Sequence, residues 1–599
     1  MSQVDTPHSF YIPVMGTGFT IDTPLFVAKY GISSTISLVD DVLIEQMRKY
    51  WCAQSGESYE PISQGEEDAR ARRITAYLNL LNKIVEKQIT TIKTEPFEPD
   101  SEITCYFEML PEGHHLKLMY EEMLHGDVAE KVKLQEKLRQ AVTAGDIDVN
   151  IMTKLDCENH VDGKPLAYEF CDAAAALRGY AKSNVSSTLV LSAGFNPGLY
   201  GYLSEFSDFF PNENARIKKK ICLKVSDYRS AVIQGKYLAK RGIWVSEYSV
   251  ESALNCGGHA FVNDGQLLGP ILEEFRTRKE ELLETLHGYY KKALFNIKKL
   301  CVDFPQKIKI TVQGGIGTNS EHEFLLRHYK VDAAGWGSPF LLVPEATNVD
   351  ERTLQKLIQA KEGDVFLSSS SPLGVPFWNL KSSASEEARR ERIARQNPGS
   401  SCIKGFLRFN KDLTAKPVCK ASREYQALKL KELAARDLPP EKEALLKEDV
   451  LAKSCICHDL SGVALLKRDI TTKSPATPAI CPGPNIINFK KIATLKEMVN
   501  HIYGRCSLFI DDGRPHLFIK DLQLQVNHLL SEIKNASVGL PARSEQKLTE
   551  VKENLSKGIE YYRSLTTGLL KEHQEKFLQA LEEFYNEINS IYLAEIPIQ

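Results

Sequence analysis

The first 345 residues repeat one pattern, in which a short apolar and β-branched run leads through a turn into an amphipathic stretch. This alternation is typical of βα units and predicts a parallel sheet. Eight runs are strand-like: Tyr11–Met15, Ser33–Leu38, Val149–Lys154, Thr188–Ala193, Ile221–Ser226, Ile243–Tyr248, Ile308–Gln313 and Val331–Trp336. Eight such strands predict an α/β fold, specifically a (β/α)₈ TIM barrel.

Some of these runs look apolar or β-branched on both faces. Thr188–Leu191 reads Thr-Leu-Val-Leu, and Ile310–Val312 reads Ile-Thr-Val. Strands of this composition are typical of a sheet that is covered on both sides. We therefore expect them to lie between a packed barrel interior and an outer layer of helices.

The second connection, residues 41–145, interrupts the alternation with a charged helical pattern such as Asp68–Lys93. Without it, the remainder of residues 1–345 is close to the roughly 250 residues of a typical barrel. We expect a helical insertion that acts as a lid or an oligomerisation arm. A packing outgrowth without function is an equally open alternative, because surface connections tolerate long insertions.

Two further regions follow the barrel. Residues 346–516 are rich in Ser, Pro and Cys and predict a loop-rich second unit. Residues 517–599 contain two stretches with heptad-like apolar spacing, Asp521–Asn535 and Glu545–Leu593. This spacing predicts a C-terminal helical hairpin.

Composition limits the classes of partner. The chain has 599 residues, 43% hydrophobic and 26% charged, and its 75 Lys and Arg against 78 Asp and Glu give a net charge of −3. It offers no polybasic field for nucleic acid or an anionic membrane. We see no export signal and no apolar run of about 18 residues, so we expect a soluble cytoplasmic protein with reduced thiols.

Glycine-rich turns follow the last two predicted strands. They are Gln313-Gly-Gly-Ile-Gly-Thr318 and Gly335-Trp-Gly-Ser338. In a TIM barrel the loops after strands seven and eight commonly bind phosphate through backbone N–H groups, and glycine lets the phosphate approach those groups. Two ordinary tight turns are the alternative. Gly16-Thr-Gly-Phe-Thr-Ile21 lacks the third glycine of a dinucleotide fingerprint, which argues against a Rossmann domain.

The turn after the sixth strand carries Gly257-Gly-His259 to the same end of the predicted barrel. With an unperturbed pKa of about 6.5, an imidazole there could act as a general base. The two glycines would let it approach a flat cofactor. A structural histidine is the alternative interpretation.

Together with Pro13-Val-Met-Gly-Thr17 and Gly335-Trp-Gly-Ser-Pro-Phe340, these motifs resemble the nitronate monooxygenase (2-nitropropane dioxygenase-like) family of FMN-binding barrels. That family includes the enoyl reductases of polyunsaturated fatty acid synthases. The resemblance covers roughly residues 10–345 and implies an FMN cofactor. It implies that the phosphate is held by Gly314, Gly315, Gly317, Gly337 and Ser338. The other implied cofactor residues are Met15, Gly16, Asn150, Lys224, Gly257, Gly258, Gln313, Thr318 and Gly335. Asn150 and Lys224 would face the flavin ring, and His259 would be the base or proton donor.

The resulting hypothesis is a flavoprotein, an FMN-dependent oxidoreductase of the nitronate monooxygenase-like class that acts on a small organic substrate. An electron donor is a further expected partner. The insertion and the long tail are departures from the compact family, and they leave the substrate and the oligomeric state open. The alternatives are an enoyl-type reductase on the same barrel and a noncatalytic, metal-stapled scaffold.

Five cysteines crowd into the second unit, and loops can bring such thiolates together around zinc or an iron–sulfur cluster. The candidate ligands are Cys402, Cys419, Cys455, Cys457 and Cys481. Their spacing matches no Cys-x₂-Cys pair, so buried unpaired thiols are the alternative. An iron–sulfur cluster beside a flavin could pass single electrons, whereas zinc would be structural.

Overall fold

The structure is a computed structural model of the 599-residue chain. It describes residues 6–591 except 162, 163, 193, 301, 302, 476, 510–512, 539, 541 and 570–573, with only the backbone described at 161 and 566–569.

Eight parallel strands form the barrel, in the order β1-β10-β9-β8-β7-β6-β3-β2. Backbone hydrogen bonds close it between the first and last of these, from Ile12 N to Ser33 O and from Thr35 N to Ile12 O, both 2.9 Å. The strands are β1 (Phe10–Tyr11), β2 (Ser34–Ser37), β3 (Ile147–Met152), β6 (Thr188–Ser192), β7 (Lys220–Val225), β8 (Val245–Glu251), β9 (Lys309–Gln313) and β10 (Ala333–Gly335). This confirms the predicted (β/α)₈ fold. Ala193, the last residue of the predicted fourth strand, lies outside the described residues.

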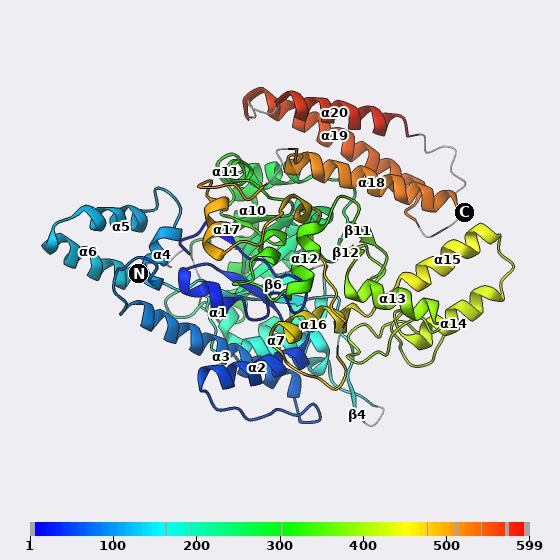
Figure 1. Ribbon diagram of the computed structural model, residues 1–599, viewed down its shortest axis with the longest axis horizontal. Helices are drawn as coiled ribbons and strands as arrows, with labels where there is room; N and C mark the ends of the chain where they lie inside the picture. Colours follow the sequence, from blue (N-terminus) through cyan, green and yellow to red (C-terminus); the bar gives the residue numbers. More distant parts are fainter. Residues whose placement is uncertain are drawn as a thin grey trace.

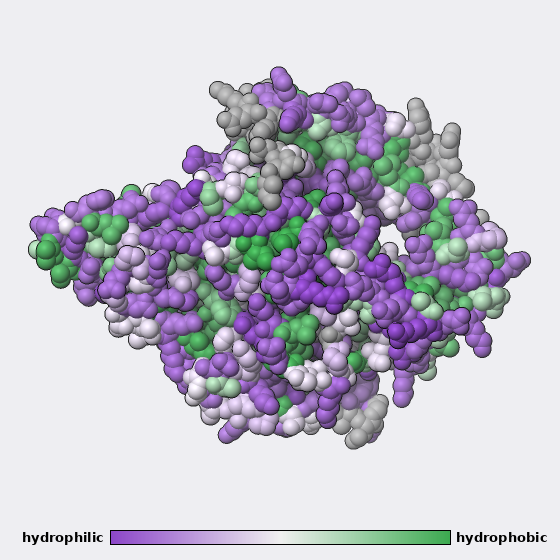
Figure 2. Space-filling model, in the orientation of Figure 1, coloured by the Kyte–Doolittle hydropathy of each residue, from purple (hydrophilic) through white to green (hydrophobic). Residues whose placement is uncertain are grey.

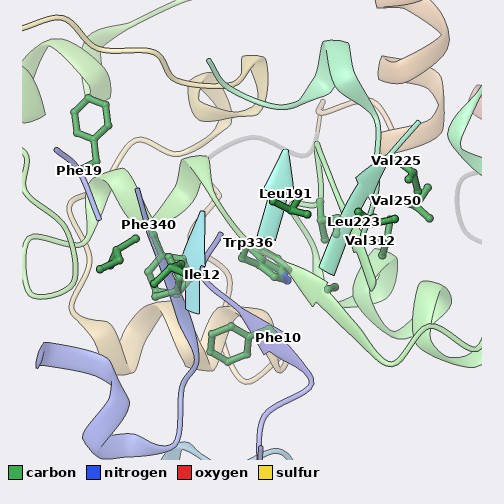
Figure 3. Close-up of a cluster of buried hydrophobic side chains, with 14 of the residues drawn as sticks. Phe10, Ile12, Phe19, Leu191, Leu223, Val225, Val250, Val312, Trp336 and Phe340 are labelled. Atoms are coloured by element: carbon green, nitrogen blue, oxygen red, sulfur yellow. The ribbon is translucent and has the colours of Figure 1, made fainter. Parts of the chain in front are cut away.

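The outward faces of the strands are apolar and pack against a ring of helices. Figure 3 shows buried side chains of this core, among them Leu191, Leu223, Val225, Val250 and Val312. Helices that follow the strands along the chain include α1 (Pro24–Val27), α7 (Asp172–Ala181), α8 (Pro197–Tyr202), α9 (Tyr228–Ala239), α10 (Leu268–Asn296) and α11 (Asn319–His328). Polar caps help to fix where these helices begin; the Asp227 carboxylate, for example, accepts from Ser230 N at the start of α9.

The inward faces are polar, which corrects the predicted packed interior. A cavity inside the barrel is lined by alternate strand residues that include Thr35, Asp148, Cys222, Glu247 and Thr311. The prediction was wrong because a threonine in a β-branched run resembles an apolar core residue in sequence, although its hydroxyl faces the cavity here. A register shift between β7 and β8 adds one residue to β8, and both Ser246 and Glu247 line the cavity.

The insertion in residues 41–145 is helical. It contains α2 (Asp41–Ser55), α3 (Ala69–Ile92), α4 (Glu102–Met109), α5 (His115–His125) and α6 (Val128–Ala141). In α2, Asp41 pairs with Arg70 and Arg73 of α3, at 2.7 and 2.8 Å. Helices α4–α6 have a small core of their own and project from the barrel as an arm (Figure 1). In Figure 2 apolar atoms gather toward the end of this arm, and exposed apolar residues of α5 and α6 are Leu118, Leu124, Val128 and Val132.

The second unit is more helical than its sequence predicts. It contains α12 (Glu351–Gln359), the antiparallel pair β11 (Val365–Ser368) and β12 (Phe377–Leu380), α13 (Ala384–Ala394), α14 (Arg423–Ala434), α15 (Pro440–Ala452), α16 (Ile456–Lys467) and α17 (Leu495–Ile502). In the barrel part of the chain, a smaller hairpin of β4 (His160–Val161) and β5 (Lys164–Pro165) lies between β3 and α7. Helices α14 and α15 bury few side chains, among them Tyr425, Leu433 and Val450. Their sequences therefore show little of the apolar periodicity that predicts a helix.

The C-terminal region has three described helices instead of the predicted hairpin: α18 (Leu517–Ser537), α19 (Glu545–Leu569) and α20 (Gln574–Asn589). They pack together along one side of the molecule (Figure 1). The predicted second helix, Glu545–Leu593, is thus divided in two, and its residues 570–573, 592 and 593 lie outside the described residues. Among the helices in the described ranges, none has the length and apolar character needed to cross a bilayer.

Candidate active site

Two adjoining cavities lie at the carboxyl-terminal mouth of the barrel. Both are lined by Val14, Gly16, Lys224, Glu251, Gly257, His259 and Cys481. The first adds Met15, Gln313, Gly314, Gly315, Gly335, Gly337 and Ser338, and the second adds Asn150 and Gly258. The structure therefore brings the predicted cofactor residues together, except Gly317 and Thr318, which lie just beyond the cavity lining. This mouth is where TIM barrels have their active sites.

A largely buried ion pair forms part of the barrel wall of this site. Lys224 Nζ of β7 lies 2.6 Å from Glu251 Oε2 of β8, and Gln313 Nε2 of β9 donates to the same oxygen at 3.0 Å. Burial acts to lower the pKa of Lys224, but Glu251 and Cys256 outweigh it and the net shift is upward. Lys224 therefore stays protonated at neutral pH. Sequence reasoning missed Glu251 because the predicted strand ended at Tyr248.

Asn150 is held in place in the middle of β3. Its Nδ2 donates to Val190 O at 3.2 Å, and its Oδ1 accepts from Ser192 Oγ at 3.4 Å. The side chain is 4% exposed and lines the second cavity. Both contacts come from the neighbouring strand β6, so the amide is oriented before any ligand binds.

His259 stands where the barrel meets the second unit. Its Nε2 is 2.8 Å from Ser371 Oγ, and its ring packs edge-on against Phe377 at a centroid distance of 4.9 Å. Burial, together with the smaller effect of the nearby Lys154, lowers the pKa of His259 to about 4. The imidazole is consequently neutral at neutral pH. In that state it can accept a proton, but it is not a cationic proton donor.

The second unit supplies the cover of the site. Trp378 N donates to Gly258 O and Ala260 N to Pro376 O, both at 2.9 Å, so β12 runs beside the Gly257–His259 turn. Apolar residues of the same unit line the second cavity, namely Phe377, Leu407, Ile456 and Leu460. Among the described residues that line either cavity, none comes from residues 41–145. The lid expected of the insertion is therefore provided by the second unit.

The turn after β9 has two glycines with positive φ, but some of its amides are already occupied. Gly314 and Gly315 have φ of 117° and 75°. At the start of α11, Glu321 Oε2 accepts from Gly317 N at 2.9 Å and from Thr318 N at 3.2 Å. Arg514 pairs with Glu321 at 2.7 Å. These two amides serve as a helix cap, a common alternative to anion binding at a helix start.

A segment of the second unit, Cys481–Asn485, lies across the glycine turns. Cys481 O accepts from Gly258 N at 3.2 Å, and Gly483 N donates to Ser338 Oγ at 2.7 Å. Asn485 Nδ2 donates to Ile316 O at 3.0 Å. The Ser338 hydroxyl is therefore engaged by the protein itself. Neither this segment nor Arg514 carries a local sequence signal that would have placed it at the barrel mouth.

Four of the cysteines predicted as metal ligands lie near one another in the second unit, and one of these four shares a cavity with the fifth. Cys402 and Cys419 are hydrogen-bonded to each other, and this bond lowers the pKa of Cys402, aided by Arg408, whose Nε lies 3.5 Å from Cys402 Sγ. Cys455 and Cys457 are close enough to Cys402 for their charges to interact, and Cys457 and Cys481 both line the second cavity. In the described part of the chain, no group of three or more His, Cys, Asp or Glu could hold a metal ion. Metal ligation stays a prediction.

No protein-family model and no curated protein matches this chain. Among solved structures, one similar chain is the enoyl reductase domain of MlnA from the macrolactin biosynthesis cluster of Bacillus amyloliquefaciens, with 13% sequence identity and a TM-score of 0.37. The match covers 83% of this chain and 93% of that chain. Function has to be inferred from the site in this chain, because one fold serves many functions.

Proposed function

We propose that this chain is an FMN-dependent oxidoreductase of the nitronate monooxygenase-like class, acting on a small organic substrate. The observation that carries the proposal is the convergence of three glycine turns, after β8, β9 and β10, on cavities that Lys224, Asn150 and His259 also line. Phosphate-binding turns and a ring of polar side chains at this mouth are typical of barrels that bind a phosphorylated cofactor.

The residues present fit FMN. Gly314, Gly315 and Gly337 would hold the phosphate, and a Cβ at Gly337 would have no neighbour closer than 3.4 Å, so the turn after β10 has room for a ligand atom. Asn255 Oδ1, which lies against Gly315, is buried without a hydrogen-bond partner in the described protein. Asn150 and Lys224 would face the flavin ring. When bound, FMN supplies the hydride-transfer chemistry that no side chain can supply.

The neutral His259 is suited to remove a proton from a carbon acid. Its Nε2 contacts Ser371, so the other ring nitrogen, Nδ1, is the candidate base if Nε2 carries the proton in that hydrogen bond. The apolar residues from the second unit limit access of water, which strengthens electrostatic interactions within the site. Lys224, held by Glu251, places a positive charge where negative charge could develop on the substrate.

An enoyl-type reduction is the second candidate, and one observation favours it. Reduction of a carbon–carbon double bond needs a proton donor, and Lys224 is protonated and buried beside the proposed ring site. The two candidates use the same cavity but move the proton in opposite directions.

The test uses the purified chain incubated with FMN under anaerobic conditions. Nitroethane or its nitronate should bleach the flavin absorbance if the first reaction occurs. For the second, dithionite-reduced flavin should be reoxidised by crotonyl thioester without oxygen. A protein that binds FMN but reacts with neither probe would contradict both candidate reactions, and one that binds no FMN would favour the scaffold alternative.

A further inference from the structure

The barrel contains a continuous polar cavity along its axis, which we call the lumen. Its lining begins at Asp146, Lys220 and Lys309, where β3, β7 and β9 start, and ends at Lys224 and Gln313, which also line the active site. Its water-accessible volume is about 480 Å³, and a single water needs roughly 10–15 Å³ of such volume. Most TIM barrels fill this space with branched apolar side chains. A polar, roomy lumen is thus a departure that calls for a physical explanation.

We propose that the lumen is a hydrated proton path that joins the amino-terminal face of the barrel to the Lys224–Glu251 pair in the active site. The inference rests on the proposed function, since a flavin-dependent reaction at carbon moves a proton in each turnover. It adds a route for that proton and names the residues that carry it.

Hydroxyl and carboxyl groups connect the two ends. Thr311 Oγ1 donates to Glu247 Oε1 at 2.7 Å, and the Thr311 side chain lies close enough to the Tyr11 hydroxyl to influence its pKa. The Tyr11 hydroxyl lies 3.2 Å from Ser249 Oγ. All four residues line the lumen, and the lining continues to Lys224. Water in the lumen would bridge the last gap, from Ser249 to the ion pair.

The carboxyl groups near the entrance are able to hold a proton. Burial raises the pKa of Glu247, against the lowering effects of Thr311, Lys309 and Cys222, while Asp332 adds to the rise. Burial also raises the pKa of Asp148, and the negative charges of Asp146 and Glu247 raise it further, although Lys220 opposes them. These shifts make both carboxyls hold a proton more readily than ordinary carboxylates do.

The proton balance is simple. For a reduction, a proton from bulk water enters at the Asp148 and Glu247 end, and each group passes on one proton as it receives another. Lys224 is then reprotonated after it has given a proton to the substrate. No electrons move along the lumen, and no co-reactant is needed.

The other mouth of the barrel explains why a separate path is useful. There the second unit covers the site with apolar side chains, and Cys481–Asn485 lies over the glycine turns. A bound substrate would block the remaining opening. Protons arriving through the lumen would avoid that obstruction, which allows the cover to exclude water without stopping proton exchange.

The first test asks whether the lumen holds water, and it does not depend on a cofactor. Radiolytic hydroxyl-radical footprinting, read by peptide mass spectrometry, oxidises side chains that lie next to water. Cys222, in the lumen, is 1% exposed, and Cys52, buried in the insertion, is 3% exposed, so they form a matched pair. We expect Cys222 to be oxidised several-fold faster than Cys52. Equal, slow oxidation of both would mean a dry lumen and would overturn the proposal.

The second test asks whether the path carries protons. Thr311→Val removes the hydroxyl with little change in shape, and Thr311→Ser keeps it as the matched control. Flavin bound to each variant is reduced by a light flash with a deazaflavin sensitiser and a sacrificial electron donor, and a pH-indicator dye reports proton uptake. We expect uptake to be about 10²-fold slower in the Val variant and close to the wild-type rate in the Ser variant.

An unchanged rate of uptake in Thr311→Val, with flavin bound and the melting temperature preserved, would overturn the proton path. If the wild-type chain takes up no flavin, the proposed function fails instead. The footprinting comparison then still decides whether the lumen is hydrated, so the two failures can be told apart.

Discussion

The two walls of the active-site cavity differ in chemistry and in origin. The barrel wall is polar and charged, with Lys224, Glu251, Gln313 and Asn150 projecting from strands. The wall from the second unit is mainly apolar, and its polar contact with His259 is through Ser371. We infer that the rigid strands of the barrel position the reactive groups and that the second unit excludes water from them.

The largest effect should come from filling the proposed phosphate site at Gly337. Gly337→Leu places a side chain where we propose that the phosphate binds, and the nearest atom to its Cβ, in Pro13, is 3.4 Å away, so the fold should tolerate it. We expect loss of FMN binding, measured by fluorescence titration. Gly288→Ala, at an open position in α10, is the control and should bind normally. Normal FMN affinity in Gly337→Leu would contradict the phosphate assignment.

Removing the imidazole where the two walls meet should stop the chemistry but not the binding. We expect His259→Ala to retain FMN and to lower turnover by about 10²–10⁴-fold, the usual contribution of a general base. Turnover of the substrate probe under saturating conditions measures this. Full activity would exclude His259 from the mechanism.

Breaking the charged pair in the barrel wall should cost stability. Lys224→Met leaves the Glu251 carboxylate buried without its cation, and we expect a loss of about 3–5 kcal/mol in the free energy of unfolding. Urea denaturation measures it. The double variant with Glu251→Gln should recover most of the stability without recovering activity. A single variant as stable as the wild type would show that the pair is unimportant for folding.

The lowered pKa of His259, which lies where the two walls meet, predicts that the free energy of unfolding depends on pH. His259 has a pKa of about 4 in the folded chain and 6.5 as its ordinary value. Between pH 4 and pH 6.5 the unfolded chain therefore binds more protons at this position than the folded chain does. The contribution of His259 to the free energy of unfolding is complete above pH 6.5 and is lost as the pH falls through 4. The contribution is about 3 kcal/mol. Unfolding of His259→Phe should depend less on pH in this window, and an identical dependence would contradict the burial of a neutral imidazole.

The smallest effect should come from removing the hydrogen bond between Ser371 and His259. Ser371→Ala removes the partner of His259 Nε2 at the cost of one hydrogen bond, about 1 kcal/mol. We expect turnover to fall by roughly tenfold with KM unchanged, since the serine positions the base and does not touch substrate. Ser371→Thr, which keeps the hydroxyl, should restore part of the loss. A change confined to KM would argue for a role in substrate binding instead.

The barrel wall could be predicted from sequence because its signals are local. Alternation along each strand predicts the barrel, and the glycine turns stand at the strand ends that form its mouth. Glu251 was missed only because the strand continues beyond Tyr248. The sequence also contains a signal for the polar lumen, because alternate residues of β7, Lys220, Cys222 and Lys224, are not aliphatic. The threonines of other strands made this signal hard to recognise, since they are β-branched like apolar core residues.

The second wall could not be predicted in this way. Ser371 is 112 residues from His259 along the chain, and Cys481 and Arg514 are more distant still. Their positions depend on tertiary packing of the second unit, which leaves no periodic pattern in the local sequence. The same packing brings Cys457 and Cys481 to one cavity, and metal ligation by the predicted cysteines stays a prediction.

The visible absorption spectrum of the purified chain, recorded before and after equilibration with FMN and gel filtration, tests directly whether the barrel mouth binds FMN. If FMN binds as proposed, flavin bands stay with the protein at close to one FMN per chain and disappear on Gly337→Leu substitution. A folded protein that remains colourless after exposure to FMN would contradict it.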